Sequence, residues 1–474
     1  MNVMKCTKIA SKIQSDLVQL IDQYPLVHPI VQAVHAAGGR TLLVGGAVRD
    51  LLLGKLTKDL DIEVHGIMLE QLESILSQFG PVDLVGKSFG VLRLHNVDID
   101  WSVPRADSAG RKPLVHIDES MSIKKAFERR DLTINAMGID LVTFELIDPF
   151  GGAADLQAHR LCAPNLELFA QDPLRFFRVM QFIGRFEMEP DEALNQCCAR
   201  MSLVDVSRER IAVEFEKLLL QSKEPSRGIR WLAQIRRLAD VLPELYETIG
   251  VEQDPGWHPE GDVFEHTMQA LDASVRITYD NEYEMLVLRY AALCHDLGKA
   301  TTTKIIDGRW RSLGHEKESA VLSKRMLKRI VMKFDLIDDV SLLAAHHMAP
   351  GQFIKLNAGL AAYKRLALKL MPRMNLHILA DLACADKQGR NPHSREPLRA
   401  LPDFFEPFLA QARKAQVEFF PEKPVLEGRD LIGIIPPGPA LGELLKRAYT
   451  IQIEEGITDK LVLKERVLAQ PLKR

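Results

Sequence analysis

Two carboxylates one residue apart, just beyond a glycine turn, are the strongest chemical signal in this chain. An apolar run over residues 42–44 stops at Gly45 and Gly46, and a β-branched segment carrying Asp59 and Asp61 follows. Side chains at i and i+2 of a strand lie on the same face, so both carboxylates can bind the same divalent cations. Hard oxygen ligands suit Mg²⁺, which keeps several waters and completes its shell with substrate phosphates.

The glycine turn adds groups that bind phosphate. Because they lack side chains, Gly45 and Gly46 let backbone N–H groups approach a triphosphate, and Arg49 adds a fixed positive charge about one turn further on. A hairpin with an exposed acidic turn is the alternative, which a lone Asp-x-Asp would favour. The Gly-Gly-x-x-Arg-Asp sequence ahead of the carboxylates favours a nucleotide site instead.

These motifs resemble those of the polymerase-β-like nucleotidyltransferases, most of all the bacterial class II CCA-adding tRNA nucleotidyltransferases and poly(A) polymerases. The resemblance implies two metals that align a 3′-hydroxyl with the α-phosphate of a nucleotide and stabilise the leaving pyrophosphate. It also implies a third carboxylate from a neighbouring strand. Asp98 and Asp100 both qualify, and the family's acid a few residues before Pro104-Arg105 favours Asp100.

A second motif, residues 128–137, supplies groups for the phosphates and the sugar. Arg130 can pair with phosphate, while Asp131 and Asn135 lie a helical turn apart and can hydrogen-bond a ribose. In isolation this pattern is typical of a helix N-terminus with Asp131 as its cap. It also resembles the family's Arg-Arg-Asp…Asn-Ala motif, and the two roles are compatible.

A third motif concerns the choice of base. Asp172 and Arg175 are i and i+3, so on a helix they share a face. An Asp acceptor beside an Arg donor complements the Watson–Crick edge of cytosine and, after a small shift, that of adenine, whereas uracil and guanine would leave buried groups unpaired. The resemblance implies protein-templated base selection by this pair, with Arg178 among the groups that hold the triphosphate and ribose. The family usually has Glu where this chain has Gln171, and a surface Asp–Arg pair is the alternative.

A later block mixes imidazole and carboxylate side chains, which favours a transition metal such as Ni²⁺, Co²⁺ or Mn²⁺ over Mg²⁺. The order H…HD…D resembles the HD-domain phosphohydrolases, in which metal-bound water attacks a phosphate ester. His315 and His347 are candidates for ligands of a second metal. The four residues of the main pattern are His266, His295, Asp296 and Asp386.

Composition limits the class of protein. The chain has 474 residues, ample apolar content for several cores and a net charge of −3, so nucleic-acid contacts must come from local basic patches. Its six cysteines show no disulfide framework and no zinc spacing, which favours a reducing compartment. No apolar run is long enough to span a membrane, and no signal peptide is recognisable. We therefore expect a cytoplasmic enzyme.

The elements that position these motifs predict an α+β protein. Alternating strand and helix signals indicate a small mixed sheet in the head, and strand signals nearly vanish beyond residue 167. A stretch rich in Pro, Gly and Trp, Gln253 to Asp262, is the best linker candidate. We expect a helical extension (1–38), a nucleotidyltransferase head (39–162), a helical neck (163–250), an HD domain (262–390) and an RNA-contacting helical tail (391–474).

Taken together, the resemblance implies a CCA-adding enzyme that uses CTP and ATP on tRNA and carries an HD phosphohydrolase. A poly(A) polymerase, or an enzyme adding only C or only A, shares every catalytic motif and is the alternative. The tail favours CCA addition, because it resembles that of CCA-adding enzymes and lacks the basic end of the poly(A) polymerases. A nucleotide-sensing HD hydrolase is less favoured because every head carboxylate is present. The sequence is silent on oligomeric state.

Overall fold

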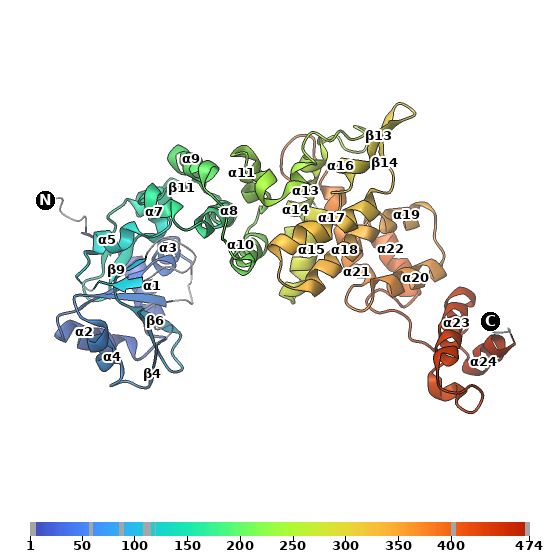
Figure 1. Ribbon diagram of the computed structural model, residues 1–474, viewed down its shortest axis with the longest axis horizontal. Coiled ribbons are helices and arrows are strands. Elements are labelled where there is room, and N and C mark those ends of the chain that lie inside the picture. Colours follow the sequence, from blue (N-terminus) through green and yellow to red (C-terminus); the bar gives the residue numbers. More distant parts are fainter. Residues whose placement is uncertain are drawn as a thin grey trace. The chain divides into compact units, whose positions relative to one another are not determined.

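The computed structural model describes residues 6–55, 60–84, 90–107, 115–118, 120–399 and 404–469. The chain divides into two compact units: Met1–Leu218 with Gln234–Arg237, and Leu219–Ala233 with Leu238–Arg474 (Figure 1). The boundary falls within helix α10 (Arg208–Gln221). The stretch Gln253 to Asp262, predicted as a linker, therefore lies inside the second unit, where its irregular backbone lines a cavity.

One mixed sheet forms the centre of the first unit. Among the described residues it has eight strands in the order β1-β10-β9-β2-β3-β6-β5-β4, all antiparallel to their neighbours except the parallel pair β3–β6. In sheet order these are Cys6–Lys8, Glu145–Ile147, Gly138–Asp140, Arg40–Val44, Leu60–His65, Ile99–Ser102, Val91–Leu94 and Val82–Leu84. In β6, Ile99 and Trp101 are buried in the core while Asp100 and Ser102 line a cavity, so strand alternation separates packing from chemistry.

The N-terminal segment is part of this unit. Strand β1 pairs with β10, so residues 6–8 extend the sheet rather than a helix, contrary to the sequence expectation. The apolar faces of the following helices join one core with the sheet, including Leu17, Val34 and Val48. These helices are α1 (Ser11–Ile21), α2 (Val27–Ala36), α3 (Gly46–Leu52) and α4 (Leu69–Leu76).

Short helices and strands complete the first unit and lead to the helices that follow it. They are β7 (Arg105–Asp107), β8 (Val115–Ile117), α5 (Ile123–Glu128), the 3₁₀ turn η1 (Thr133–Asn135), α6 (Gly152–Gln157), β11 (Arg160–Leu161), α7 (Leu166–Ala170), α8 (Leu174–Phe186), β12 (Glu189–Pro190), α9 (Glu192–Arg200) and α10. Within α8, ten residues are buried, among them Phe176, Phe177 and Phe182. This apolar face fixes the start of α8 at the edge of the head.

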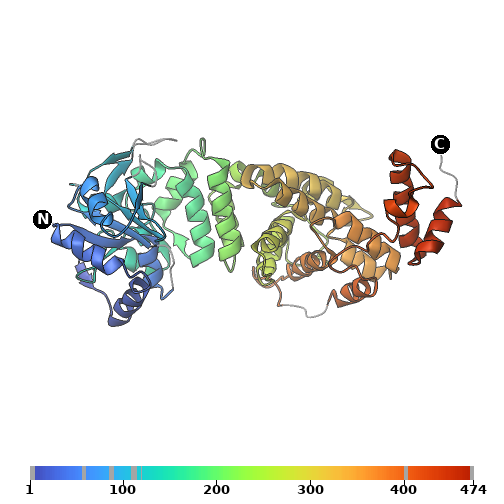
Figure 2. The same cartoon turned by 90° about the horizontal axis from the view of Figure 1, so that it is seen from below.

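Helices dominate the second unit (Figure 2). Helix α14 packs on α15 and α21, and α17 packs on α18. The helices from the boundary onward are α11 (Ser226–Gln234), α12 (Leu238–Val241), α13 (Pro243–Tyr246), α14 (Val263–Val275), α15 (Glu282–Cys294), α16 (Lys299–Thr302), α17 (His315–Ile330), α18 (Phe334–His346), α19 (Ala349–Lys355), α20 (Leu360–Leu370), α21 (Leu376–Gln388), α22 (Glu406–Lys414), η2 (Gly428–Leu431), α23 (Pro439–Glu455) and α24 (Lys460–Leu468). The mixed-sheet head followed by helices confirms the predicted fold class. No helix in the described ranges is long and apolar enough to cross a membrane.

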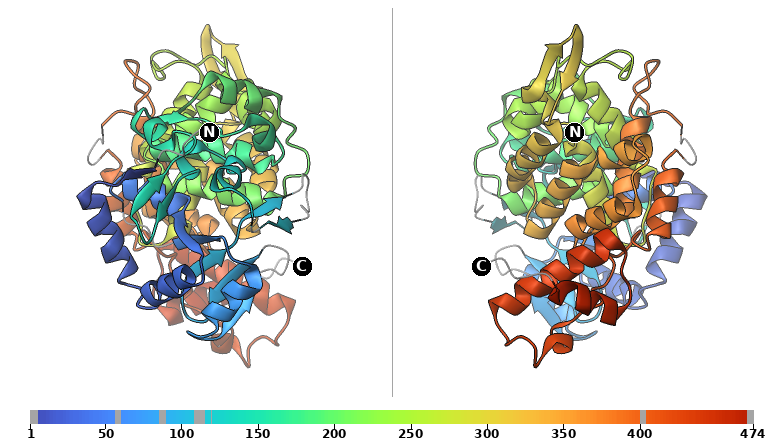
Figure 3. Two further views of the ribbon diagram at one scale, coloured as in Figure 1. Left: turned by 90° about the vertical axis from the view of Figure 1, so that its left-hand side faces the viewer. Right: turned by 90° about the vertical axis from the view of Figure 1, so that its right-hand side faces the viewer.

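A hairpin interrupts the helices of the second unit. Strands β13 (Thr303–Ile306) and β14 (Arg309–Ser312) pair antiparallel and project from the helices, shown in yellow in Figure 3. Asp307 and Gly308 both have positive φ, as the two-residue hairpin turn requires. The expectation of almost no strand beyond residue 167 is therefore wrong here, although the Asp307-Gly308 pair is itself a sequence signal for a hairpin turn.

Candidate functional site

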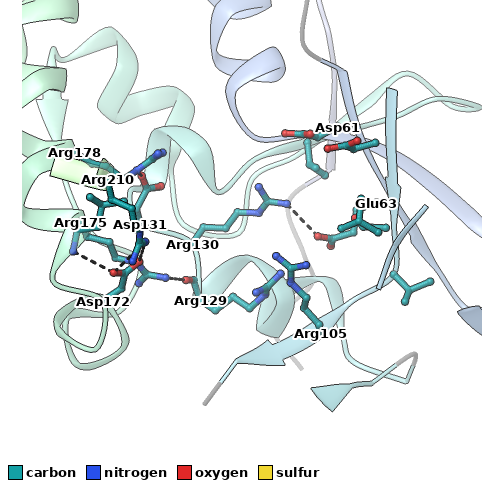
Figure 4. Close-up of a pocket in the computed structure, with 16 residues that line it drawn as sticks. Asp61, Glu63, Arg105, Arg129, Arg130, Asp131, Asp172, Arg175, Arg178 and Arg210 are labelled. Atoms are coloured by element: carbon teal, nitrogen blue, oxygen red, sulfur yellow. Dashed lines mark hydrogen bonds and ion pairs between the residues drawn. The ribbon is translucent and has the colours of Figure 1, made fainter. Parts of the chain in front are cut away.

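A cavity of about 390 Å³ opens in the first unit, where the ends of β3 and β6 face helix α8. Figure 4 shows Asp61 and Glu63 of β3 on one side of it, Arg130 reaching toward Glu63, and a mixed group of acids and arginines on the other side (Asp131, Asp172, Arg175, Arg178 and Arg210). The charged side chains that line it are Asp61, Glu63, Asp100, Arg105, Arg129, Arg130, Asp131, Asp172, Arg175, Arg178 and Arg210. Paired carboxylates opposite a row of guanidinium groups are suited to a polyphosphate with its divalent cations.

The predicted acids lie where two strands run side by side. Asp61 on β3 is in register with Asp100 on the parallel strand β6, and both line the cavity. The other candidate, Asp98, lies before β6; its side chain is 74% exposed and does not line the cavity. Arg93 pairs with both, at 2.6 Å from Asp100 and 3.1 Å from Asp98. Asp59 lies outside the described residues.

Glu63 is a cavity residue that the sequence reasoning missed. It follows Asp61 by two positions on β3, so it lies on the same face of the strand. Its buried carboxylate lies 2.9 Å from Nε2 of His65 and accepts from Arg130 at 3.1 Å. Burial alone would raise the pKa of Glu63, but the bond with His65 and the charge of Arg130 outweigh it and lower the pKa to about 2. Continuing the Asp-x-Asp alternation by one step would have found it.

The glycine turn lies against these groups. Gly45 has φ +74°, and a Cβ there would lie 3.0 Å from Nη1 of Arg130 and 4.0 Å from Oδ2 of Asp61. A side chain at this position would therefore be strained and would crowd both charged groups. Gly46 begins helix α3. The turn therefore places its backbone close to the side chains of Arg130 and Asp61, just after the end of β2.

Arg49 and Asn135, predicted to contact phosphate and ribose, are not among the residues that line the cavity. Arg49 is only 6% exposed, its Nη1 donates to Oδ1 of Asn135 at 2.6 Å, and burial lowers its pKa. Asn135 in turn donates to Asp131 at 3.0 Å. The two residues support Asp131 from behind, because helix α3 turns the guanidinium of Arg49 inward beneath the glycine turn, where it lies over the ring of Phe186.

Asp131 and Arg178 form the part of this network that reaches the cavity. Nε of Arg178 lies 2.5 Å from Oδ2 of Asp131. Burial would raise the pKa of Asp131, yet the charge of Arg178 and the bond from Asn135 lower it to about 2. The carboxylate is therefore ionised and held in one orientation at neutral pH.

The predicted base-selecting pair is arranged differently from the expectation. Asp172 lies in the turn before α8 and accepts the main-chain N–H of Leu174 at 3.1 Å, so it shares no helix face with Arg175. The guanidinium of Arg175 donates to the carbonyls of Leu168 and Arg129. Arg210 of α10, which the sequence reasoning did not select, donates to Asp172 at 3.1 Å. Both predicted residues still line the cavity. Pro173 disfavours helical backbone at Asp172, so α8 begins after it.

In the second unit, all six predicted metal ligands come together. Asp296 lies at their centre. Its Oδ2 is 3.5 Å from Nε2 of His266 and 3.3 Å from Nε2 of His295. Its Oδ1 is 3.2 Å from Nε2 of His315 and 3.7 Å from that of His347.

The two sides of Asp296 form two ligand clusters. On one side, Nε2 of His266 lies 3.2 Å from Oδ1 of Asp386 and 3.2 Å from Nε2 of His295. On the other, the Nε2 atoms of His315 and His347 are also 3.2 Å apart. The geometry therefore brings together two sets of possible ligands, of which Asp296 belongs to the second and also lies beside the first. The sets are His266, His295 and Asp386, and Asp296, His315 and His347.

Hydrogen bonds fix the orientation of these histidine rings. A carbonyl oxygen can only accept, so Nδ1 carries the proton and Nε2 is left as a metal ligand, the usual arrangement around metal sites. Three rings donate from Nδ1 to main-chain oxygens at 2.7–2.8 Å: His295 to Ala292, His315 to Ser312 and His347 to Ala344. The fourth, His266, has Nδ1 beside Glu260 at 2.7 Å and the carbonyl of Gly389 at 3.0 Å.

The donor set fits transition metals. Imidazole nitrogens and carboxylate oxygens converge in the interior, and Oδ1 of Asp296 is buried without a hydrogen-bond partner within the described part of the chain. Burial lowers the pKa of His266, but the bonds with Asp386 and Glu260 outweigh it and raise the pKa to about 9, so a bound metal must displace a proton from Nε2. Glu260, along with His258 at 2.9 Å from it, is a further group that the sequence reasoning missed.

Comparison with known families follows this division of the chain. Residues 41–162 match the family described as "Poly A polymerase head domain", residues 185–248 match "Probable RNA and SrmB- binding site of polymerase A", and residues 263–386 match "HD domain". Fold, sites and families together define a nucleotidyltransferase head joined to an HD domain.

Two relatives specify the family. The multifunctional CCA protein of Halorhodospira halophila is 31% identical over 428 residues, which cover 85% of this chain and 94% of the relative. That of Pasteurella multocida is 33% identical over 362 residues, covering 73% of this chain and 83% of the relative. The chain belongs to the family of multifunctional CCA proteins.

Solved structures share the fold at lower sequence identity. The Thermotoga maritima CCA-adding enzyme complexed with tRNA matches with a TM-score of 0.60 and 22% identity, over 98% of this chain and 99% of that chain. The Bacillus stearothermophilus CCA-adding enzyme in complex with CTP matches with a TM-score of 0.59 and 19% identity, over 93% and 96%.

Proposed function

We propose that this protein adds C, C and A to the 3′ end of tRNA from CTP and ATP. The observation that supports this most directly is the cavity of the head, where Asp61 and Asp100 lie in register opposite arginines from α8 and α10. Relatives over most of the chain carry the name multifunctional CCA protein. The head corresponds to residues 39–162, with a helical neck to 250, and acts on its own substrates independently of the HD domain at 262–390.

In this proposal the acids of β3 and β6 hold Mg²⁺. The donor set fits, because carboxylate oxygens from adjacent strands converge at one wall of the cavity. When bound, Mg²⁺ supplies charge stabilisation for the phosphates and activation of the 3′-hydroxyl. The proposed ligands are Asp61, Asp100 and Asp59, which precedes Asp61 by two residues in the sequence.

The arginines and the ribose-binding group complete the nucleotide site. Arg130, which Glu63 holds at 3.1 Å, and Arg178, which Asp131 holds at 2.5 Å, face the triphosphate. Asp131 accepts from the ribose hydroxyls, and the buried Asn135 and Arg49 keep it in place. Groups that are already fixed lose little freedom when the substrate binds.

The choice of base is assigned to Asp172 and Arg175. Two carbonyls fix the plane of the Arg175 guanidinium, and the N–H of Leu174 fixes the carboxylate of Asp172. A rigid acceptor and donor favour cytosine and adenine over uracil and guanine, whose edges present the opposite pattern. The contact between Asp172 and Arg210 adds a constraint at the same carboxylate.

The deciding experiment uses tRNA that lacks its 3′ end, incubated with CTP and ATP separately and together. CTP alone should give two additions, ATP alone none, and the two together the complete CCA end. Repeated addition of A with ATP alone would instead identify a poly(A) polymerase, and a single type of addition would identify a C-only or A-only enzyme.

We further propose that the HD domain hydrolyses phosphate esters with a transition metal such as Ni²⁺, Co²⁺ or Mn²⁺. When bound, the metal supplies activation of a water molecule for attack on phosphorus. Lys299, whose Nζ lies 2.7 Å from Asp296 and 2.8 Å from Oε1 of Gln253, is placed to hold a phosphate oxygen at the rim of the cluster. Phosphate release from phosphomonoesters and 2′,3′-cyclic nucleotides across these metals tests the proposal.

The described free cysteines support a reducing compartment, which we take to be the cytoplasm.

A further inference from the structure

A second cavity, of about 280 Å³, lies over the HD ligand cluster. Its floor includes Asp296, His315, His347 and Asp386. This volume is close to the lower limit of about 300 Å³ for small-molecule pockets. The space therefore accommodates more of a substrate than the phosphate group alone.

Two exposed tryptophans line this cavity. Trp257 is 64% exposed and Trp310 is 36% exposed, whereas Trp101 and Trp231 are buried in the cores. A large aromatic ring left open to solvent at a cavity wall is unusual, because its burial elsewhere would stabilise the fold. Exposed aromatic rings beside a phosphate site are the usual platform for stacking a nucleobase.

Both tryptophans are tied to the metal cluster through the main chain. Strand β14, which carries Trp310, ends at Ser312, whose carbonyl accepts from the ring of His315 at 2.7 Å. Trp257 lies in a turn closed by its own N–H to the carbonyl of Asp254 at 3.0 Å. The next residue, His258, is linked through Glu260 to the ligand His266. Each ring is thus held on a short segment anchored to the ligands.

Cationic groups occupy the same cavity. Lys299, Arg311 and Arg390 line it together with the tryptophans. Arg390 pairs with Asp386 at 3.0 Å, while Arg311 is exposed on β14 next to Trp310. Aromatic and basic side chains beside a hydrolytic cluster match a ligand that has both a flat base and a phosphate.

We propose that Trp257 and Trp310 bind the base of a nucleotide whose phosphate lies at the HD ligand cluster, so that the base lowers KM relative to a base-free sugar phosphate. This rests on the proposed phosphohydrolase function. The phosphate lies at the ligand cluster, and the base lies against the exposed rings at the cavity wall. The two tryptophans are then specificity-determining residues of the second site.

The test compares 2′,3′-cyclic AMP with methyl ribofuranoside 2,3-cyclic phosphate, which keeps the ester and sugar but has no base. In the full-length protein with added Ni²⁺, Trp257→Ala and Trp310→Ala should each raise KM for 2′,3′-cyclic AMP about tenfold, with kcat little changed. The KM for the base-free ester should not move. The Phe variants should retain the wild-type KM, because the stacking surface remains.

A matched control is Leu313→Ala, since Leu313 is 70% exposed beside the hairpin and does not line the cavity. It should leave both KM values unchanged. As a readout independent of turnover, 2′,3′-cyclic AMP should quench the tryptophan fluorescence of the wild-type protein. The Trp257→Phe/Trp310→Phe double variant should lose this quenching. Equal wild-type KM values for the two esters would overturn the base assignment while the phosphohydrolase stands. Failure to hydrolyse either ester with any metal would instead contradict the phosphohydrolase.

Discussion

Substitution of the two acids around β6 provides a matched pair that separates chemistry from folding. Asp98 and Asp100 lie two residues apart, and each forms an ion pair with Arg93. Asp98→Asn removes an exposed ion pair and Asp100→Asn a half-buried one, each of them solvent-accessible and worth at most about 1 kcal/mol, so their effects on stability should be similar. Only Asp100 is in register with Asp61 and lines the cavity.

The magnitudes of the two effects on activity should differ greatly. Loss of a carboxylate that binds a catalytic metal costs several kcal/mol of transition-state stabilisation, and about 4 kcal/mol corresponds to a ~10³-fold lower rate. Asp100→Asn should therefore lose at least ~10³-fold in kcat/KM for CTP addition. Asp98→Asn, with a side chain 74% exposed outside the cavity, should lose less than about fivefold.

The assay is single-nucleotide addition of labelled CTP to a tRNA that lacks its 3′ end, with urea unfolding of both variants as the control for folding. Equal losses in the two variants would refute the reasoning from strand register. A larger loss in Asp98→Asn would reverse the assignment of the third carboxylate.

Other outcomes follow from the two sites. Asp61→Ala should abolish nucleotide addition while leaving phosphate release by the HD domain intact; parallel loss of both in a folded protein would contradict two independent sites. Arg175→Ala should permit use of UTP and GTP in the same addition assay, and unchanged selectivity together with unchanged use of CTP would exclude it from base choice. Asp296→Ala should abolish metal-dependent phosphate release and reduce the amount of Ni²⁺ that the protein binds, measured by calorimetry, while CCA addition is retained. Because the pKa of buried Glu63 is lowered from 4.5 to about 2, its ionised form contributes about 3 kcal/mol above pH 4.5, which is lost as the pH falls through about 2. Glu63→Gln should therefore reduce the free energy of unfolding by about that amount at pH 7, and the difference from wild type should shrink below pH 4.5.

The sequence alone determined which chemically active residue types both candidate sites contain. A glycine turn followed by Asp-x-Asp, and the order H…HD…D, depend on residue types and short spacings, which are visible without a fold. The same local patterns predicted a mixed-sheet head followed by helices. Hydrophobic periodicity and turn residues act over a few positions, so they can be recognised from sequence directly.

Only the tertiary structure decided which of these side chains face a common cavity. Strand register set Asp100 beside Asp61, and helix α3 turned Arg49 inward, where it donates to Asn135 and lies outside the cavity lining. Glu63 orients the guanidinium of Arg130, which lies far from it in the sequence. Which strands lie side by side depends on contacts between distant segments, such as the pairing of β3 with β6, and short spacings in the sequence do not report it.

The second unit illustrates the same division. The ligand types were readable, but the central position of Asp296, with one oxygen toward each pair of histidines, depends on how four helices and the hairpin pack. The segment from Gln253 to Asp262 has the composition of a linker, yet it lies beside the cluster and brings Trp257 to the cavity. Composition reports the absence of regular backbone, whereas the packing of neighbouring elements decides where that backbone lies.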